Sequence, residues 1–200
     1  MLGYFLIIFS YVLGSIPNAL WIGKLFKRMD IREYGSGNIG STNAARVLGY
    51  GYGVMTLILD VSKGLIPVYI AIKLYPQNYI LHILVSMGSI IGHSYSIFLK
   101  FKGGKAVATS LGVFIILSFK SVLVLIVIFI LIVLITGYVS VASMTAASLL
   151  FIFVHIFNHN IFYTVFAMFI GLLVIYRHKS NILNLLNGTE AKFKDKADKN

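Results

Sequence analysis

The chain has 200 residues, of which 58% are hydrophobic and only 12% are charged, and its mean hydropathy is +0.90. This exceeds what a soluble domain of that size needs and predicts an all-α, polytopic membrane protein. The lack of cysteine excludes disulfides and thiolate chemistry, and the formal charge of +11 indicates membrane topology, anionic lipid or an anionic substrate, with no nucleic acid expected.

Apolar runs along the chain predict about seven transmembrane helices, each of which needs about 20 residues to span a bilayer. The predicted crossings, of which the fourth and sixth are short, are residues 2–22, 52–73, 79–99, 106–119, 121–138, 142–157 and 160–176. The first run lacks a basic leader and a cleavage motif, so we interpret it as a retained helix rather than a signal peptide. Without the breaks at Lys120, Gly137 and the serine-rich segment 140–148, the count would be five.

The distribution of basic residues predicts the orientation of these helices. With the N-terminus outside, the inner segments hold all of the 17 Lys and Arg residues except Lys63, Lys73 and Lys120. This asymmetry fits the positive-inside rule and places the C-terminus in the cytoplasm. We expect one membrane domain over residues 1–189, followed by a polar, disordered cytoplasmic tail over 190–200 that is attracted to anionic lipid. Every glycine-rich polar segment then lies at the inner face.

The first candidate site is the polar segment 34–49, YGSGNIGSTNAARVLG, which lies between apolar helices. Its glycines permit positive φ angles and a close approach of a ligand, and its Ser, Thr and Asn side chains can cap the helix that follows. The start of that helix suits an anion, and Arg46 can pair with a phosphate in bidentate geometry. No strand precedes the glycines, so a dinucleotide fingerprint is excluded. A flexible loop with a capped helix is the alternative.

The second candidate site is the segment 92–112, GHSYSIFLKFKGGKAVATSLG. It is not a Walker A loop, because Leu99 stands where the first glycine is needed. Two glycines, Lys105 and a helix that begins near residue 106 still predict an anion-binding nest, to which Thr109 can add a hydroxyl. Topology-setting charge explains the other lysines of the loop equally well, but it does not explain the glycine pair. His93 is more often an interfacial histidine with satisfied hydrogen bonds than a catalyst.

The third candidate site is the segment 177–190, RHKSNILNLLNGTE, which ends the last crossing. Basic residues commonly anchor the inner end of a membrane helix, and that is the simpler interpretation of this segment. His178 and Asn181 are three positions apart and would share a helix face, which is compatible with contact to one ligand.

Asp60 and Lys63 are charged residues inside the second predicted crossing. Intramembrane charge is a functional hypothesis by default, but a structural ion pair between residues three apart is the better-supported interpretation. Ser143 can likewise serve only helix packing. The acidic residues and histidines form no metal-binding pattern, so no metal or cofactor is expected. His93 is followed five positions later by Phe98, which excludes the His–Asp pair of soluble-type acyltransferases. The chain therefore offers several anion binders and few general bases.

With these residues the chain closely resembles the bacterial acyl-phosphate:glycerol-3-phosphate acyltransferases. The resemblance runs through GSIPNALWIGK (14–24), GSGNIGSTNAARVLG (35–49) and the second and third candidate sites, in order over the whole chain. It implies a seven-helix enzyme of the bacterial cytoplasmic (inner) membrane whose active site faces the cytoplasm. The implied reaction transfers an acyl chain from acyl-phosphate to glycerol 3-phosphate and gives lysophosphatidic acid and phosphate, the first step of phospholipid synthesis. The implied partners are these substrates, membrane lipid and the enzyme that produces the acyl-phosphate.

The resemblance also assigns roles to individual residues. It implies that Ser36, Arg46 and Lys105 are catalytic residues that bind the substrate phosphates. It further implies three groups of substrate-binding residues: Asn38, Thr42 and Asn43 in the first candidate site; Gly103, Gly104 and Thr109 around the donor phosphate; and Ser143, His178 and Asn181 for glycerol 3-phosphate. Gly14, Ser15 and Pro17 match a motif that we interpret as shaping a helix end.

Three positions depart from the family pattern, and one of them bears on the phosphate loop. Ser96 stands where the family usually has proline, Ala106 where it has glycine and Asn184 where it has arginine. If Ala106 has a negative φ the change is tolerable, whereas a positive φ would strain the loop.

Two other functional classes remain open from the residues alone. A transporter for a small organic anion could use the same helix ends, although no internal repeat is evident and the polar motifs lie at one face rather than at mid-membrane. A non-catalytic binder of anionic lipid is the third class.

Overall fold

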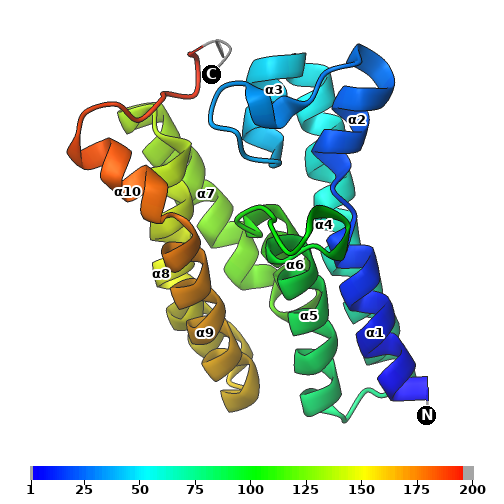
Figure 1. Ribbon diagram of the computed structural model, residues 1–200. Helices are drawn as coiled ribbons and strands as arrows, with labels where there is room; N and C mark the ends of the chain where they lie inside the picture. Colours follow the sequence, from blue (N-terminus) through cyan, green and yellow to red (C-terminus); the bar gives the residue numbers. More distant parts are fainter. Residues whose placement is uncertain (1, 196–200) are drawn as a thin grey trace. The chain divides into compact units, whose positions relative to one another are not determined.

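The computed structural model describes residues 2–195, and it is helical throughout, with no β-strand in that range (Figure 1). In chain order the elements are α1 (Leu2–Ser15), α2 (Asn18–Lys27), the 3-10 turn η1 (Ile31–Glu33), α3 (Ser41–Leu48), α4 (Tyr50–Leu74), α5 (Tyr79–Ser94), the 3-10 turn η2 (Ile97–Leu99), α6 (Val107–Leu117), α7 (Phe119–Thr136), α8 (Val139–Asn158), α9 (Ile161–Arg177) and α10 (Lys179–Leu186). Each of the seven predicted crossings corresponds to an apolar helix or a bent helix pair.

Four segments are long and apolar enough to span a membrane: α4, residues 79–99, α7 and α8. The number becomes six if the bent pairs α1–α2 and α9–α10 each form one span. The remaining apolar helix, α6, has only 11 residues, which is fewer than the ~17 that a complete crossing requires. The predicted all-α membrane bundle is confirmed, while the orientation of its termini stays a prediction.

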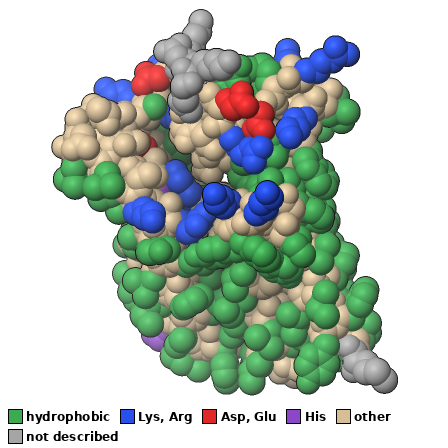
Figure 2. Space-filling model, in the orientation of Figure 1, with side chains coloured by type: hydrophobic (Ala, Val, Ile, Leu, Met, Phe, Trp, Pro, Cys, Tyr) green, Lys and Arg blue, Asp and Glu red, His purple; other side chains and the backbone are tan. Residues whose placement is uncertain are grey.

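The outer surface of these helices is apolar, as a membrane environment requires. Helix α7 exposes Leu134 by 75% and Ile135 by 81%, side chains that a soluble protein would bury. Apolar side chains cover much of the visible surface, whereas the Lys and Arg side chains gather in one part of it (Figure 2). The exposed apolar side chains are therefore suited to contact with lipid tails.

The first predicted crossing is interrupted, because α1 and α2 meet at a bend of 43°. Pro17 lies at this break as the N-terminal cap of α2. Proline has no N–H to donate and disfavours helical geometry in the preceding residue, so the helix ends before it. The helix-end role predicted for the motif around Pro17 is confirmed by this geometry.

The described chain divides into two compact units, with the boundary between Val113 and Phe114 inside α6. Unit 1 comprises residues 2–113 together with Asp195, and unit 2 comprises residues 114–194. The single-domain organisation expected for residues 1–189 stays a prediction.

Close glycine contacts hold the helices of unit 1 together. A β-carbon on Gly14 of α1 would overlap the carbonyl of Ser89 in α5, and one on Gly92 would overlap the carbonyl of Tyr11. Gly64 of α4 makes the same kind of approach to the backbone of Thr109 in α6. Small residues let helix backbones approach closely in membranes, where water provides no driving force for association. These contacts fix the ends of α5 and α6 that flank the second candidate site.

Unit 2 is built from the end of α6 and the consecutive helices α7 to α10. Gly171 of α9 packs against the backbone of Ala147 in α8, and the rings of Phe114 and Phe166 stack with centroids 5.7 Å apart. The start of the predicted tail contacts the turn between α7 and α8, where the Phe193 N–H donates to the Gly137 carbonyl over 2.8 Å. The disorder expected over residues 190–200 stays a prediction, and residues 196–200 lie outside the described residues.

Candidate functional site

Asn43 organises the loop of the first candidate site. Its side chain is buried at the start of α3, and its Nδ2 lies 3.1, 3.2 and 3.0 Å from the carbonyl oxygens of Ile31, Tyr34 and Asn38. Its Oδ1 accepts the Ser36 N–H over 3.1 Å. One amide side chain therefore ties several turns of backbone into a fixed shape. The substrate contact predicted for Asn43 stays a prediction, but its role in shaping the loop is a finding that the sequence did not reveal.

The glycines of this loop confirm part of the expected geometry. Gly35, Gly37 and Gly49 have φ angles of 59°, 64° and 104°, in the left-handed region that glycine tolerates best. Side-chain capping of α3, in contrast, was predicted wrongly: the cap residue is Gly40, and no side chain caps the helix start. A sequence rich in serine, threonine and asparagine permits a side-chain cap but does not require one. Here Asn43 directs its side chain to the preceding loop instead.

The residues of this segment that are predicted to contact substrate lie on or beside one short helix. Ser36 is exposed, and its Oγ accepts the Asn38 N–H over 3.4 Å. Thr42 and Arg46 are half-buried and lie four residues apart on α3, so they share one face of the helix. A hydroxyl and a guanidinium on one face can contact the same phosphate group.

A local ion pair lies in the segment between α2 and α3. Arg32 donates from Nε and Nη2 to the two carboxylate oxygens of Asp30, over 2.9 and 2.6 Å, and its backbone N–H also bonds Asp30 Oδ1. The side-chain hydrogen bonds from Arg32 lower the pKa of Asp30 below its ordinary value, although desolvation opposes the effect. This pair holds the chain just before the polar loop.

The second candidate site is a loop that packs onto the end of α5. The Gly104 N–H donates to the carbonyl of His93 over 3.0 Å. A β-carbon on Gly103 would overlap that same carbonyl, and one on Gly104 would overlap Nε2 of the His93 imidazole. Neither glycine has a positive φ. Their glycine requirement therefore comes from this close approach and not, as at Gly35 and Gly37, from a left-handed backbone.

The left-handed residues of this loop are not glycines. Lys100, Phe101 and Ala106 have φ angles of 51°, 61° and 58°. Ala106 is buried and directly precedes α6, at the position where the resembled family has glycine. A left-handed conformation costs a non-glycine residue about 1–2 kcal/mol, so this alanine is strained. The sequence left open whether Ala106 has a negative or a positive φ, and in the structure its φ is positive.

Lys105 and Thr109 lie on either side of the start of α6. Lys105 is half-buried in the loop, between the packed Gly104 and the strained Ala106. Thr109 is fully buried, and within residues 2–195 its Oγ1 has no hydrogen-bond partner. Both positions are compatible with contact to an anion at the helix start, and their substrate contacts stay predictions.

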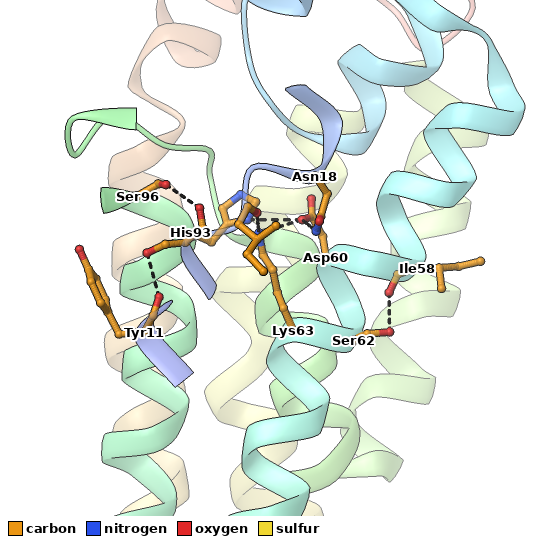
Figure 3. Close-up of polar contacts among 10 residues, drawn as sticks. Tyr11, Asn18, Ile58, Asp60, Ser62, Lys63, His93 and Ser96 are labelled. Atoms are coloured by element: carbon orange, nitrogen blue, oxygen red, sulfur yellow. Dashed lines mark hydrogen bonds and ion pairs between the residues drawn. The ribbon is translucent and has the colours of Figure 1, made fainter. Parts of the chain in front are cut away.

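A buried polar cluster lies beneath this loop (Figure 3). Asp60 and Lys63 of α4 form the expected ion pair, with Lys63 Nζ 2.8 Å from Asp60 Oδ1. Asn18 of α2 donates to the same oxygen over 2.8 Å, and Lys63 also donates to the carbonyl of Ile16 over 2.9 Å. His93 Nδ1 lies 3.9 Å from Asp60 Oδ1. The pair is therefore part of a network that joins the α1–α2 break, α4 and α5.

The third candidate site lies in unit 2, where His178 joins α9 and α10. His178 is buried, and its Nδ1 is 2.7 Å from the carbonyl of Val174. A carbonyl can only accept, so Nδ1 is the donor in this contact. Asn181 donates to Glu190 Oε1 over 2.7 Å, and Ser143 is buried in α8. The partnership of Asn181 with Glu190 was not anticipated from the sequence.

The predicted site residues thus fall into two sets. Unit 1 contains Ser36, Asn38, Thr42, Asn43, Arg46, Gly103, Gly104, Lys105 and Thr109; unit 2 contains Ser143, His178 and Asn181. Sequence reasoning did not anticipate that His93 supports the glycine pair or that Asn18 joins the ion pair. No group of three or more histidine or acidic side chains that could hold a metal ion is present in residues 2–195.

Comparison with known proteins matches nearly the whole chain to one protein family. The model of the family described as glycerol-3-phosphate acyltransferase matches residues 4–188. A glycerol-3-phosphate acyltransferase of Fusobacterium nucleatum is 50% identical over 190 residues, which cover 94% of this chain and 96% of that protein. One of Syntrophotalea carbinolica is 45% identical, covering 96% and 97%.

Two solved structures are similar to this one. The glycerol 3-phosphate form of PlsY, an integral membrane glycerol 3-phosphate acyltransferase, superimposes with a TM-score of 0.92 at 42% identity and covers 96% of each chain. The lysophosphatidic acid form gives a TM-score of 0.89 at 40% identity and covers 96% of this chain and 95% of that one.

Proposed function

The chain belongs to the glycerol-3-phosphate acyltransferase family, and from this premise we propose that it transfers an acyl chain from acyl-phosphate to glycerol 3-phosphate. The products are lysophosphatidic acid and inorganic phosphate. Relatives that carry the acyltransferase name, and PlsY structures in glycerol 3-phosphate and lysophosphatidic acid forms, support the acceptor and the lipid product. The choice of acyl-phosphate as donor rests on the site.

The observation that carries the donor assignment is the packing of Gly103 and Gly104 onto the end of α5. This packing holds the backbone directly before Lys105 and the start of α6. Backbone amides, a helix start and a lysine suit a phosphate group. Acyl-phosphate carries its phosphate on the carbon that reacts, so binding this group also positions the reacting carbonyl.

We propose roles in acceptor binding for the residues of each unit in turn. We assign Ser36, Arg46, Asn38, Thr42 and Asn43 to the anionic end of glycerol 3-phosphate or to the loop that holds it. Ser143, His178 and Asn181 are assigned to the rest of the acceptor. The hydrogen bond from Nδ1 to the Val174 carbonyl fixes the orientation of the His178 ring.

The reaction needs no strong protein base. The acceptor hydroxyl oxygen attacks the carbonyl carbon of acyl-phosphate, a new C–O ester bond forms, and the bond from that carbon to the bridging phosphate oxygen breaks. The hydroxyl proton passes to a phosphate oxygen, and inorganic phosphate leaves. The protein contributes proximity and fixed electrostatics through Lys105 and Arg46.

We propose further that the enzyme lies in the bacterial cytoplasmic membrane with its site toward the cytoplasm, where another enzyme supplies acyl-phosphate. The chain has no cysteine, so single introduced cysteines report topology directly. In sealed right-side-out vesicles an impermeant maleimide should label Gln77→Cys and spare Lys102→Cys, both at exposed positions. The reverse pattern refutes the orientation.

The function is tested with purified protein, glycerol 3-phosphate and a verified acyl donor. Acyl-phosphate should give lysophosphatidic acid and phosphate in equal amounts, acyl-CoA should give neither, and Lys105→Ala should abolish turnover. Use of acyl-CoA alone, or full activity of Lys105→Ala, would contradict the proposal. Uptake of labelled glycerol 3-phosphate into sealed vesicles without product would favour a transporter.

A further inference from the structure

The buried network under the glycine loop connects three helices to one backbone segment. Asp60 and Lys63 are 1% and 4% exposed in the middle of α4, and His93 is 4% exposed at the end of α5. Figure 3 shows Asn18, Lys63 and His93 converging on the Asp60 carboxylate from different segments. None of these side chains takes part in the proposed reaction, so their cost of burial needs another explanation.

The network continues from the Asp60 carboxylate to the loop that contains Gly103 and Gly104. On one side, the His93 imidazole lies 3.9 Å from Asp60 through Nδ1. On its other side, Nε2 occupies the place that a side chain on Gly104 would need, and the His93 carbonyl accepts the Gly104 N–H. One residue therefore contacts both the buried charge and the backbone that precedes Lys105.

The other end of the loop is fixed to α1. Ser96 Oγ donates to the carbonyl of Ser15 over 2.5 Å, and Tyr11 Oη donates to the carbonyl of Tyr95 over 3.0 Å. Ser96 is a departure from the resembled family, and this hydrogen bond gives its serine a role that proline lacks. With its start held by α1, the loop depends on His93 for the placement of its far end.

We propose that Asp60 is a positioning residue, which orients His93 and through it sets the Gly104–Lys105 backbone for the donor phosphate. The contribution of Lys63 and Asn18 is to hold the carboxylate. The effect of the loop position on catalysis rests on the proposed function. The effect of Asp60 on the loop position does not.

A purely structural ion pair is the competing explanation, and the contacts argue against it. Asp60 Oδ2 is buried with no hydrogen-bond partner in the described chain, while Oδ1 contacts Asn18, Lys63 and His93. Buried ion pairs stabilise a fold only when the remaining lone pairs are satisfied as well. The interactions concentrate on the oxygen that faces His93, which is what positioning requires.

The test removes both charges together, as Asp60→Asn with Lys63→Met, so that no lone buried charge destabilises the fold. The asparagine keeps an acceptor for Asn18. Ser62→Ala is the matched control, because Ser62 lies beside Lys63 on α4 but bonds only its own helix, at Ile58. Each variant is assayed in vesicles for thermal unfolding, amide hydrogen exchange of residues 101–106 and steady-state kinetics.

The double variant should unfold like the wild type, and hydrogen exchange in 101–106 should accelerate at least about tenfold, with peptides from α7–α9 unchanged. Its kcat/KM should fall by at least about tenfold, since a misplacement of ~1 Å costs on the order of 10²-fold. The substrate whose KM rises should be the one affected by Lys105→Arg. The proposal would be overturned if the double variant folds, exchanges at residues 101–106 as fast as the wild type, and keeps a kcat/KM within about twofold of the wild-type value.

A second variant keeps the result decisive if the double variant does not fold. His93→Gln leaves the Asp60–Lys63 pair in place and should produce the same faster exchange and lower kcat/KM. Wild-type exchange in this variant also overturns the proposal. If the wild-type protein does not use acyl-phosphate, the proposed function fails, but hydrogen exchange still decides whether Asp60 positions the loop.

Discussion

The imidazole of His93 occupies the space where Gly104 would carry a side chain, and the carbonyl of the same histidine accepts the Gly104 N–H over 3.0 Å. This contact gives the glycine pair a steric reason. Glycine is needed because helix α5 and the loop touch, and the loop then continues directly into Lys105.

Gly104→Ala should lower kcat/KM by at least about tenfold, because the added methyl group displaces the loop from His93. The displacement is relieved if His93 is shortened, so the double variant His93→Ala, Gly104→Ala should be no worse than the poorer single variant. Gly51→Ala is the control, since a β-carbon there meets nothing within 4 Å. Additive losses in the double variant would show that the two residues act independently.

Ala106→Gly should stabilise the protein by about 1 kcal/mol, because glycine relieves the strain of the positive φ. For a chain of this length that corresponds to a rise in Tm of roughly 2–4 °C. The control is Ala108→Gly inside α6, which should destabilise by about 1 kcal/mol. A decrease in the Tm of Ala106→Gly would mean that the left-handed alanine is not strained.

Asn43→Ala should destabilise the protein by roughly 1–3 kcal/mol and lower activity, since its side chain bonds the backbone at four places. Asn43→Asp keeps the acceptor for Ser36 but loses the donors, so it should not restore stability. Thermal unfolding is compared with that of Asn184→Ala, an exposed asparagine that should change stability by less than about 0.5 kcal/mol. Equal, small effects of both alanine variants would contradict the organising role.

The Asp30–Arg32 pair should make a pH-dependent contribution to stability. Arg32 lowers the pKa of Asp30 in the folded state, so the contribution is present above the unfolded value of about 4 and is lost as the pH falls through the lower, folded value. Asp30→Asn should therefore destabilise at pH 7 by less than about 1 kcal/mol, because Arg32 is half-exposed. The difference from the wild type should shrink in acid; a difference that grows in acid would contradict the assigned pKa direction.

The sequence predicted the helical fold because apolar runs and basic loops are properties of single segments. Pro17, likewise, marks a helix break by its own chemistry. The sequence also indicated that α6 is short, because the fourth predicted crossing is one of the two shortest of the seven.

The support of the site could not be predicted in the same way, because it depends on contacts between distant segments. His93 and Gly104 are eleven positions apart, and Asn18 and Asp60 are 42 apart. The sequence also does not show which role each glycine has: Gly37 serves a turn, Gly104 serves a close approach, and the turn at residue 106 is made by alanine. Only backbone angles and neighbouring atoms distinguish these cases.

We propose that the acceptor hydroxyl attacks the carbonyl carbon of acyl-phosphate, and the position of an isotope in the products tests this step. The purified protein is given glycerol 3-phosphate and acyl-phosphate with ¹⁸O in the bridge between carbon and phosphorus. We expect the label to leave in inorganic phosphate and lysophosphatidic acid to form in equal amount without it. Label retained in a fatty acid, with a phosphoryl group transferred to the glycerol, would contradict attack at the carbonyl carbon, as would the absence of lipid product.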